Sequence, residues 1–323
     1  VLRAVYLVGG AVRNLALSLP LPQDYDFAVQ ADKKRGLTAL AAALSAAFNG
    51  SFFLLDKDAP SYRIALKLKD MPFTVDLSPV KGRDILEDLN GRDFTVNAAA
   101  IDLKALFTNR PSVIDPLSGL KDAKKKLLKA VSTKAFDEDP LRCLRAIRLM
   151  LQYGFRLTER TRAAIRKKAR FMENTSRERV RDELVLIFSG TGTAEALNVM
   201  SGLDMMHSVM PEACLWGDAG GYDLLSHALK TGREAEAVLQ GIRRGEFEPY
   251  TERLEARFAA RSGAVPWHAA FKLSAFLHDA GKPLTMTRKN GALRFWGHEA
   301  LGARITRDML LRLRFSRRTS LEV

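Results

Sequence analysis

Cysteine is scarce in this sequence: its 323 residues contain two, Cys143 and Cys214, and neither lies in a Cys-x-x-Cys spacing. Two cysteines build neither a disulfide framework nor a structural zinc cluster, and their scarcity is typical of a reducing cytosol. Long apolar runs are also missing, because no segment approaches the ~18 residues that a membrane span needs. The first residues lack a signal-peptide layout. These absences predict a cytoplasmic protein without membrane segments.

Acidic residues are outnumbered: 51 Lys and Arg against 37 Asp and Glu give a net charge of +14 and a pI near 9.9. This excess favours a polyanionic partner, although a solvated basic surface would give the same count. A hydrophobic content of 47% excludes a disordered chain. The length predicts about two compact units. The sequence starts at Val1 without Met, and we expect native ends to be missing.

The pattern of apolar residues changes along the chain. Up to about residue 135, apolar strands alternate with short helices, which predicts a small mixed sheet with helices on one face. Beyond it, helical periodicity dominates, and a Gly-rich stretch at 216–221 marks a further break. We therefore expect an α+β protein with regions 1–135, 136–205 and 206–323. The expected strands are 5–8, 25–29, 51–55, 62–69 and 72–77, the last two forming a hairpin; the expected helices are 12–19, 39–48, 141–152, 159–171, 176–188 and 194–203.

The first chemical motif combines two glycines with two aspartates. Gly9 and Gly10 stand between a strand and a helix, where backbone N–H groups can approach a phosphate, and Arg13 can clamp it. Asp24 and Asp26 lie two residues apart in a strand and so present two carboxylates on one face. Hard oxygen donors at this spacing suit Mg²⁺. Each motif alone is also compatible with an ordinary turn or a solvated strand end.

A second motif, from Gly91 to Ala98, contains Arg92, Asp93 and Asn97. Its arginine offers a cation for phosphate, and its carboxylate and amide offer hydrogen bonds for ribose hydroxyls. Asp93 could equally cap a helix. Asp76, which alternates inside its own strand, is a candidate third carboxylate, with a buried or solvated strand residue as the alternative.

The third motif predicts a helix that begins near Asp139 and Pro140, an N-cap residue followed by proline. Arg142, Arg145 and Arg148 recur every three residues and form a stripe on one side of this helix. Like charges at this spacing repel one another, and a bound triphosphate or RNA backbone would relieve the repulsion.

These motifs together resemble a known family. Five of them, Gly-Gly-Ala-Val-Arg, Asp-Tyr-Asp, Arg-Asp-Phe-Thr-Val-Asn-Ala, Glu-Asp-Pro-Leu-Arg and Glu178-Arg179-Val-x-x-Glu183, appear in the order seen in class II tRNA nucleotidyltransferases and bacterial poly(A) polymerases. The resemblance covers about residues 1–205. It implies a polymerase-β-like nucleotidyltransferase head in which Asp24 and Asp26 hold Mg²⁺, followed by helical neck and body domains.

The resemblance also implies roles for single residues. Arg92 and Asp93 would handle the phosphate and ribose of the incoming nucleotide, and Arg145 would contact the nucleotide. The protein template that reads the base without a nucleic-acid template matches Glu138, Asp139 and Arg142, of which the last two would bond to the Watson–Crick edge. The alternative is that Asp139 only caps the helix and Arg142 only belongs to the phosphate-facing stripe.

The sequence departs from the family pattern at a few positions. Asn14 stands where an Asp is usual, and Gly91 where a second Arg is common. The segment from Asp76 to Arg92 is short, as in family members that add only CC, whereas many CCA-adding members have a longer loop. These departures leave the product open.

The C-terminal region carries histidine and aspartate in spacings that resemble the HD phosphohydrolase domain: His227, the pair His278-Asp279, and His298. Adjacent nitrogen and oxygen ligands suit a divalent transition metal that activates water. The usual last Asp ligand is not identifiable before the sequence ends, and Asp308 is the nearest candidate. A lone histidine is more often structural.

We therefore expect a template-independent nucleotidyltransferase that binds the 3′ end of tRNA and adds C, or C and A, from CTP and ATP with Mg²⁺. The sequence leaves its oligomeric state open. Three alternatives remain: a poly(A) polymerase, a metal-dependent phosphohydrolase with an RNA-binding head, and a purely structural RNA-binding protein.

Overall fold

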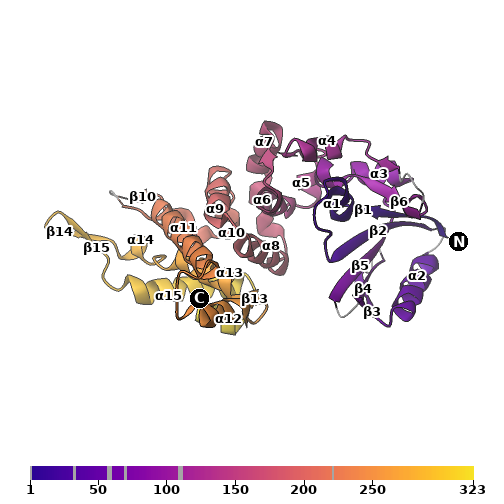
Figure 1. Cartoon of the computed structure of the whole chain (residues 1–323). Coiled ribbons are helices and arrows are strands. Elements are labelled where there is room, and N and C mark those ends of the chain that lie inside the picture. Colours follow the sequence, from indigo (N-terminus) through magenta and orange to yellow (C-terminus); the bar gives the residue numbers. More distant parts are fainter. Residues whose placement is uncertain (1, 32–33, 57–59, 69–70, 108–111, 220–221) are drawn as a thin grey trace. The chain divides into compact units, whose positions relative to one another are not determined.

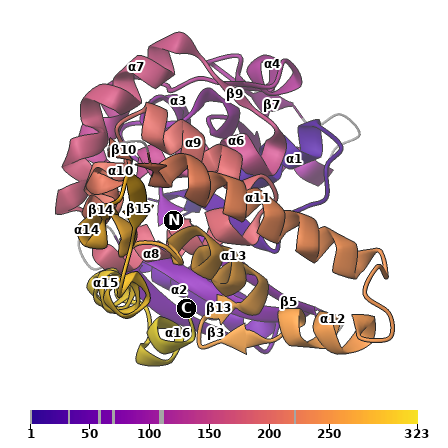
Figure 2. The ribbon, with the colours of Figure 1, turned by 90° about the vertical axis from the view of Figure 1, so that its left-hand side faces the viewer.

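The computed structural model describes residues 2–31, 34–56, 60–68, 71–107, 112–219 and 222–323. They divide into two compact units (Figures 1 and 2). The head unit contains residues 1–135 and 156–161, and the helical unit contains residues 136–155 and 162–323. The mixed α+β architecture confirms the expected fold class. Among the described residues, no helix combines the length and the apolar character needed to cross a membrane.

The head unit is built on a seven-stranded mixed sheet with the strand order β3-β4-β5-β2-β1-β6-β7. The strands β2 and β5 run parallel, and the other neighbours are antiparallel. The bounds are β1 Leu2–Val8, β2 Asp24–Ala31, β3 Ser51–Asp56, β4 Ser61–Leu68, β5 Met71–Pro79, β6 Ala100–Asp102 and β7 Val113–Ile114. The strands β4 and β5 pair as expected, and the connection at residues 69–70 lies outside the described residues.

Helices cover both faces of this sheet, whereas the sequence analysis placed them on one. Leu37 of α2 packs on Val29 and Leu77, and Leu89 of α3 packs on Ala28 of the opposite face. The second face gains its helix because the chain after β5 turns back over it. The bounds in this unit are α1 Gly10–Ala16, α2 Lys34–Ala47, α3 Ile85–Asn90, η1 Thr95–Asn97, η2 Ala105–Phe107, α4 Gly119–Lys124, β8 Leu127–Leu128 and β9 Arg156–Leu157.

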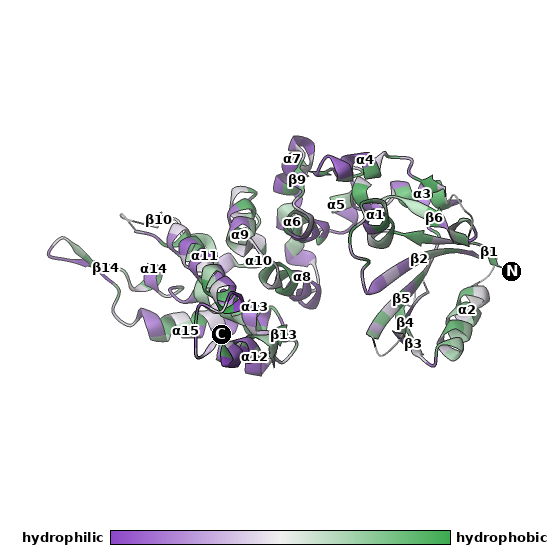
Figure 3. Cartoon of the chain, in the orientation of Figure 1, coloured by the Kyte–Doolittle hydropathy of each residue, from purple (hydrophilic) through white to green (hydrophobic). Residues whose placement is uncertain are grey.

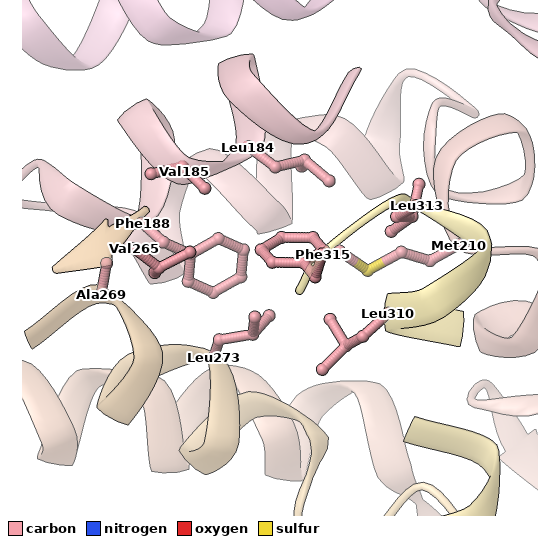
Figure 4. Close-up of a pocket in the computed structure, with 10 residues that line it drawn as sticks. All are labelled: Leu184, Val185, Phe188, Met210, Val265, Ala269, Leu273, Leu310, Leu313 and Phe315. Atoms are coloured by element: carbon pink, nitrogen blue, oxygen red, sulfur yellow. The ribbon is translucent and has the colours of Figure 1, made fainter. Parts of the chain in front are cut away.

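The helical unit packs its helices around apolar faces. Helices α8, α13 and α15 surround a small apolar pocket whose lining contains no polar side chain (Figure 4). Its lining residues are Leu184, Val185, Phe188, Met210, Val265, Ala269, Leu273, Leu310, Leu313 and Phe315. Helices α11 and α13 also pack against each other. Figure 3 shows the contrast with α7, which is mostly hydrophilic.

The elements of this part of the chain are α5 Ala135–Glu138, α6 Arg142–Tyr153, α7 Glu159–Lys168, η3 Ala169–Asn174, α8 Arg177–Ser189, α9 Thr193–Gly202, α10 Met206–Val209, η4 Pro211–Leu215, β10 Asp218–Ala219, β11 Tyr222–Asp223, α11 Leu224–Arg243, α12 Thr251–Ala259, β12 Arg261–Ser262, β13 Val265–Pro266, α13 Trp267–Leu277, α14 Lys282–Thr285, β14 Thr287–Lys289, β15 Ala292–Arg294, α15 His298–Arg312 and α16 Arg317–Glu322. The expected helix 159–171 is therefore two elements, because the last turns tighten into the 3₁₀ helix η3. A division of this unit near residue 205 stays a prediction.

Candidate active site

The turn between β1 and α1 requires glycine at position 9. Gly9 has φ 71° and ψ −136°, in the left-handed range that strains other residues. A Cβ at this position would lie 3.4 Å from Oδ2 of Asp26 and 3.5 Å from Nη1 of Arg92. The turn therefore brings a carboxylate of β2 and the guanidinium that follows α3 to the same stretch of bare backbone.

The two aspartates of β2 lie on one face of the sheet. Asp24 and Asp26 are both exposed, and they share the face of Ala28 because side chains alternate along a strand. Thr74 of β5 lies opposite Asp24, and its hydroxyl group donates a hydrogen bond to the Asp24 carboxylate. Asp76 lies opposite Asp26. Three carboxylates therefore line one side of the β2–β5 pair.

Asp76 forms an ion pair with an arginine of the neighbouring strand. Arg63 of β4 donates two hydrogen bonds to it, Nε to Oδ1 at 2.7 Å and Nη2 to Oδ2 at 2.6 Å. The hydrogen bond to Asp76 raises the pKa of Arg63 against the effect of burial, and the charges of Asp24 and Asp26 raise it further. Both oxygens of Asp76 are thus committed to Arg63. Asp24 and Asp26 are more exposed than Asp76, and all three as ligands of a divalent cation stay predictions.

Arg92 is held by an acidic partner on α3. Its Nε and Nη2 atoms donate to Oδ2 of Asp88 at 3.1 and 3.0 Å, and the backbone N–H of Lys81 donates to the other oxygen at 2.9 Å. Asp88 is 5% exposed, so this contact fixes the guanidinium. The remaining nitrogen, Nη1, is the one that lies near Gly9.

The other residues of the second motif form a buried network with Arg13. Arg13 is 3% exposed and donates to Oδ1 of Asn97 at 2.6 Å and to Oδ1 of Asn14 at 2.9 Å. Asn97 donates in turn to Oδ1 of Asp93 at 3.1 Å, and the backbone N–H of Phe94 donates to the same oxygen at 2.7 Å. In this structure these residues join α1 to η1. Their contacts with a phosphate or ribose stay predictions.

The proposed template residues lie at the start of α6. Asp139 accepts hydrogen bonds from the backbone N–H of Leu141 at 3.2 Å and from Nη2 of Arg179 at 2.7 Å. The helix therefore begins at Arg142, one residue later than expected, because the Asp139 carboxylate bonds to a turn before it. Arg142 forms an ion pair with Glu138 at 3.3 Å, and its side chain is 12% exposed. The carboxylate of Asp139 and the guanidinium of Arg142 are therefore each held by a neighbouring charged side chain, Arg179 and Glu138 respectively.

A buried glutamate neutralises part of the arginine stripe. Glu183 of α8 is 6% exposed and accepts from Nε of Arg145 at 3.4 Å and from Nε of Arg148 at 2.7 Å. The repulsion between these two arginines therefore does not require a bound polyanion, which corrects the sequence-based reasoning. This ion pair could not be predicted from the sequence, because Glu183 lies 35 residues from Arg148.

The structure brings together all four residues of the C-terminal His and Asp motifs. Asp279, which is 4% exposed, lies 3.1 Å from Nε2 of His227, 3.0 Å from Nε2 of His278 and 3.4 Å from Nε2 of His298. Ligand atoms of His227, His278 and Asp279 lie within 4.8 Å of one another, and no other described group of three or more such residues meets this criterion. We call these four residues the His–Asp cluster. Asp308 instead pairs with Arg307 on α15, and its side chain is 60% exposed.

Hydrogen bonds orient the rings of the His–Asp cluster. The Nδ1–H of His278 can donate to the carbonyl of Ala275 at 2.9 Å, and that of His298 to the carbonyl of Phe295 at 2.7 Å. In that tautomer the Nε2 atom of each neutral ring carries the lone pair that a metal ion would accept. The ammonium of Lys282 lies 2.6 Å from Oδ2 of Asp279. Burial raises the pKa of Asp279, but the hydrogen bond and charge of Lys282, together with the charges of His278 and His227 when these are protonated, outweigh burial, so that this pKa falls below its usual value.

Comparisons with known proteins agree with this architecture. The family described as the poly A polymerase head domain matches residues 5–129, and the family described as a probable RNA and SrmB-binding site of polymerase A matches residues 154–215. An A-adding tRNA nucleotidyltransferase of Deinococcus radiodurans is 31% identical over 95% of this chain and 64% of its own length. A CC-adding tRNA nucleotidyltransferase of Thermus thermophilus is 32% identical over 95% of this chain and 64% of its own length.

Solved structures share the fold. A structure described as a tRNA-processing enzyme in apo form 2 superposes with a TM-score of 0.68 at 18% identity, over 98% of this chain and 76% of that one. A Thermotoga maritima CCA-adding enzyme complexed with tRNA gives 0.60 at 20% identity, over 99% and 73%.

The mixed sheet, its glycine turn and its paired aspartates all lie in the part of the chain that the poly A polymerase head-domain family matches. This chain belongs to the family of class II CCA-adding enzymes and poly(A) polymerases, whose members generally depend on divalent metals. It spans 64% of the length of the two curated relatives above.

Proposed function

We propose that this chain transfers a nucleotidyl group from CTP or ATP to the 3′ end of a tRNA and releases pyrophosphate. The observation that carries the proposal is the placement of Asp26 and Arg92 on either side of the bare backbone at Gly9, with Asp24 on the same sheet face. Exposed carboxylates and a fixed guanidinium are the groups that a triphosphate and its metal ions require.

The head supplies the groups for in-line displacement at the α-phosphorus. Asp24 and Asp26 would hold Mg²⁺, which supplies charge stabilisation for the entering and departing oxygens. The 3′-oxygen of the RNA forms a bond to the α-phosphorus, and the bond to the bridging oxygen of pyrophosphate breaks. One of the two carboxylates accepts the hydroxyl proton. Arg92, fixed by Asp88, neutralises charge on the triphosphate.

Base selection falls to Asp139 and Arg142. The pairing of Asp139 with Arg179 and of Arg142 with Glu138 limits the rotamers that these two side chains adopt. A fixed donor and acceptor pair distinguishes bases by their Watson–Crick edges without a nucleic-acid template. The contacts of Asp139 with Leu141 and Arg179 also leave Arg142 as the side chain whose removal alters the helix start least.

We propose C addition as the basic reaction. The segment between β5 and Arg92 is short and structured, since Asp84 caps α3 by accepting from the N–H of Glu87 at 3.0 Å. A short segment here is the feature that resembles CC-adding members. The two relatives described above are named for adding different nucleotides, although their sequence identity to this chain is nearly equal. An assay with ATP therefore decides whether this chain also adds the terminal A.

The Asp26→Asn variant tests this proposal. It removes a carboxylate charge at the site with a minimal change of shape, and we expect nucleotide incorporation to fall roughly 100- to 1,000-fold while tRNA binding stays nearly intact. Asp204→Asn, at a side chain that is 73% exposed in the helical unit, is the charge-matched control and should retain activity. Normal turnover in Asp26→Asn would contradict the site assignment.

The His–Asp cluster supports a second function, hydrolysis of a phosphate ester at a divalent transition metal. Its nitrogen lone pairs and buried carboxylate converge as metal ligands do, and Lys282 supplies a cation for phosphate. Titration with Co²⁺ should produce visible absorption that His278→Ala abolishes. Phosphatase activity on p-nitrophenyl phosphate should require the same residue. Co²⁺ absorption that is unchanged in His278→Ala would refute this site.

A further inference from the structure

The hairpin formed by β14 and β15 has an unusual charge pattern. Residues 280–298 contain no Asp or Glu, and its three cations, Arg288, Lys289 and Arg294, are exposed. No acidic side chain of the described residues forms an ion pair with Lys289 or Arg294. A solvated hairpin more often intersperses both signs of charge, so no ion pair inside the hairpin accounts for Lys289 and Arg294.

The hairpin stands away from the helices of its own unit (Figure 1). Its two-residue loop places Asn290 at φ 52° and Gly291 at φ 78°, the geometry that Asn-Gly favours in tight hairpins. At its base, the ring of Phe295 packs on Tyr222 with centroids 4.9 Å apart, and the Lys282 ammonium lies 5.3 Å from the Phe295 centroid. The cations are therefore presented on a preformed support.

An exposed tryptophan follows directly. Trp296 is 80% exposed, whereas Trp216 is 2% exposed and Trp267 is covered by the Arg257 guanidinium at 3.7 Å. Thr287 pairs with Arg294 and Lys289 with Ala292, so that Lys289 and Arg294 lie on the same face of the hairpin. Trp296 follows Arg294 by two residues, so one short segment offers an indole for stacking and cations for a charged backbone.

We propose that this hairpin, Lys289, Arg294 and Trp296, binds single-stranded nucleic acid. A base stacks on the indole of Trp296, and adjacent phosphates pair with Lys289 and Arg294. Single-stranded nucleic acid fits because it offers exposed base faces and regularly spaced negative charge together. An acidic protein segment would use the two cations but would not need the indole. The surface is separate from the proposed transfer chemistry, because it needs neither Asp24 and Asp26 nor a triphosphate.

Binding of a fluorescein-labelled twelve-nucleotide oligo(A) measures this interaction by anisotropy. We expect Trp296→Ala to weaken binding roughly 5- to 100-fold, and Trp296→Phe to retain most of the affinity because a phenyl ring still stacks. Removing both cations in Lys289→Ala/Arg294→Ala should reduce the slope of log K against log salt by about 1.4. Thermal melting of each variant checks that the fold is intact.

Matched variants separate this surface from the general basicity of the chain. Lys230→Ala/Arg253→Ala removes two exposed cations elsewhere in the same unit and should leave the salt slope nearly unchanged. Intrinsic fluorescence gives an independent signal, since stacking should quench Trp296 in a Trp267→Phe background. The same binding should persist in the transfer-deficient Asp26→Asn variant. Equal affinity in wild type and Trp296→Ala, or tryptophan emission that changes with anionic phosphatidylserine vesicles and not with oligo(A), would overturn the proposal.

Discussion

Replacing Lys272 of α13 by methionine should destabilise the helical unit strongly. Lys272 is 3% exposed, and its ammonium donates to the carbonyl of Gly190, to Oγ1 of Thr193 at 2.8 Å and to Oε1 of Glu236 at 3.4 Å. The same glutamate oxygen accepts from the N–H of Thr193 at 2.7 Å. Burial lowers the pKa of Lys272, and Glu236 opposes this effect. The ion pair joins α13 and α11 to the loop before α9.

The expected magnitude follows from burial. Removing one partner of a buried ion pair costs about 3–5 kcal/mol, because the other charge is left without compensation. Lys272→Met and Glu236→Leu should each cost at least about 3 kcal/mol on this basis. The double variant leaves no stranded charge and loses only hydrogen bonds to a few neutral groups, so it should cost no more than about 3 kcal/mol, well below the sum of the two single effects. The coupling energy is then roughly 3 kcal/mol, at the upper end for neighbouring residues.

Urea unfolding followed by intrinsic fluorescence measures this quantity well. All three tryptophans of the chain lie in the helical unit, so their emission reports this unit and not the head. Lys230→Met, at an exposed position of α11, is the control and should change stability by less than about 0.5 kcal/mol. Two results would refute the claim that Lys272 and Glu236 stabilise the unit as a pair. In one, the stability losses of the two single variants add up to that of the double variant; in the other, Lys272→Met loses less than about 1 kcal/mol.

Four shorter predictions concern other parts of the chain. Arg142→Ala should lose about 1–3 kcal/mol of selectivity for CTP over UTP and GTP, by analogy with base readout, and a uniform drop of kcat/KM for all four nucleotides would rule out its template role. Burial raises the pKa of Cys143 to about 12, so at pH 8 a thiol reagent should modify Cys214 alone in the native chain and both after unfolding. The stability that Cys143 contributes should be complete below pH 9 and fall as the pH rises toward 12, which urea titrations at several pH values would detect. Gly281→Ala should weaken Co²⁺ binding, since its Cβ would lie 2.2 Å from the carbonyl oxygen of His298; unchanged absorption would contradict this packing.

The sequence predicted the parts of the site that depend on local geometry. The glycine turn and the alternating pair Asp24 and Asp26 lie where strand periodicity and backbone freedom place them. The cluster of His227, His278, Asp279 and His298 was also predictable, although only through resemblance, because two helices, α11 and α15, and the turn after α13 contribute to it.

Long-range neutralisation could not be predicted from one sequence. Arg63 meets Asp76 because β4 pairs with β5 in one register, and a shift of one residue would place the two on opposite faces. Glu183 reaches Arg148 from a different helix. Asn97 accepts a hydrogen bond from Arg13 across 84 residues. In each case the partner is set by tertiary packing and not by local propensity.

Nucleotide incorporation by the purified chain tests the central claim most directly. The assay supplies Mg²⁺, each nucleoside triphosphate singly, and tRNA primers that lack their last three, two or one nucleotides, with products sized on a gel. We predict extension by CTP of primers that lack three or two nucleotides, lost in Asp26→Asn and retained in Asp204→Asn. Long tails from ATP alone would instead indicate a poly(A) polymerase, and no incorporation from any triphosphate would contradict the assignment of the head as a nucleotidyltransferase.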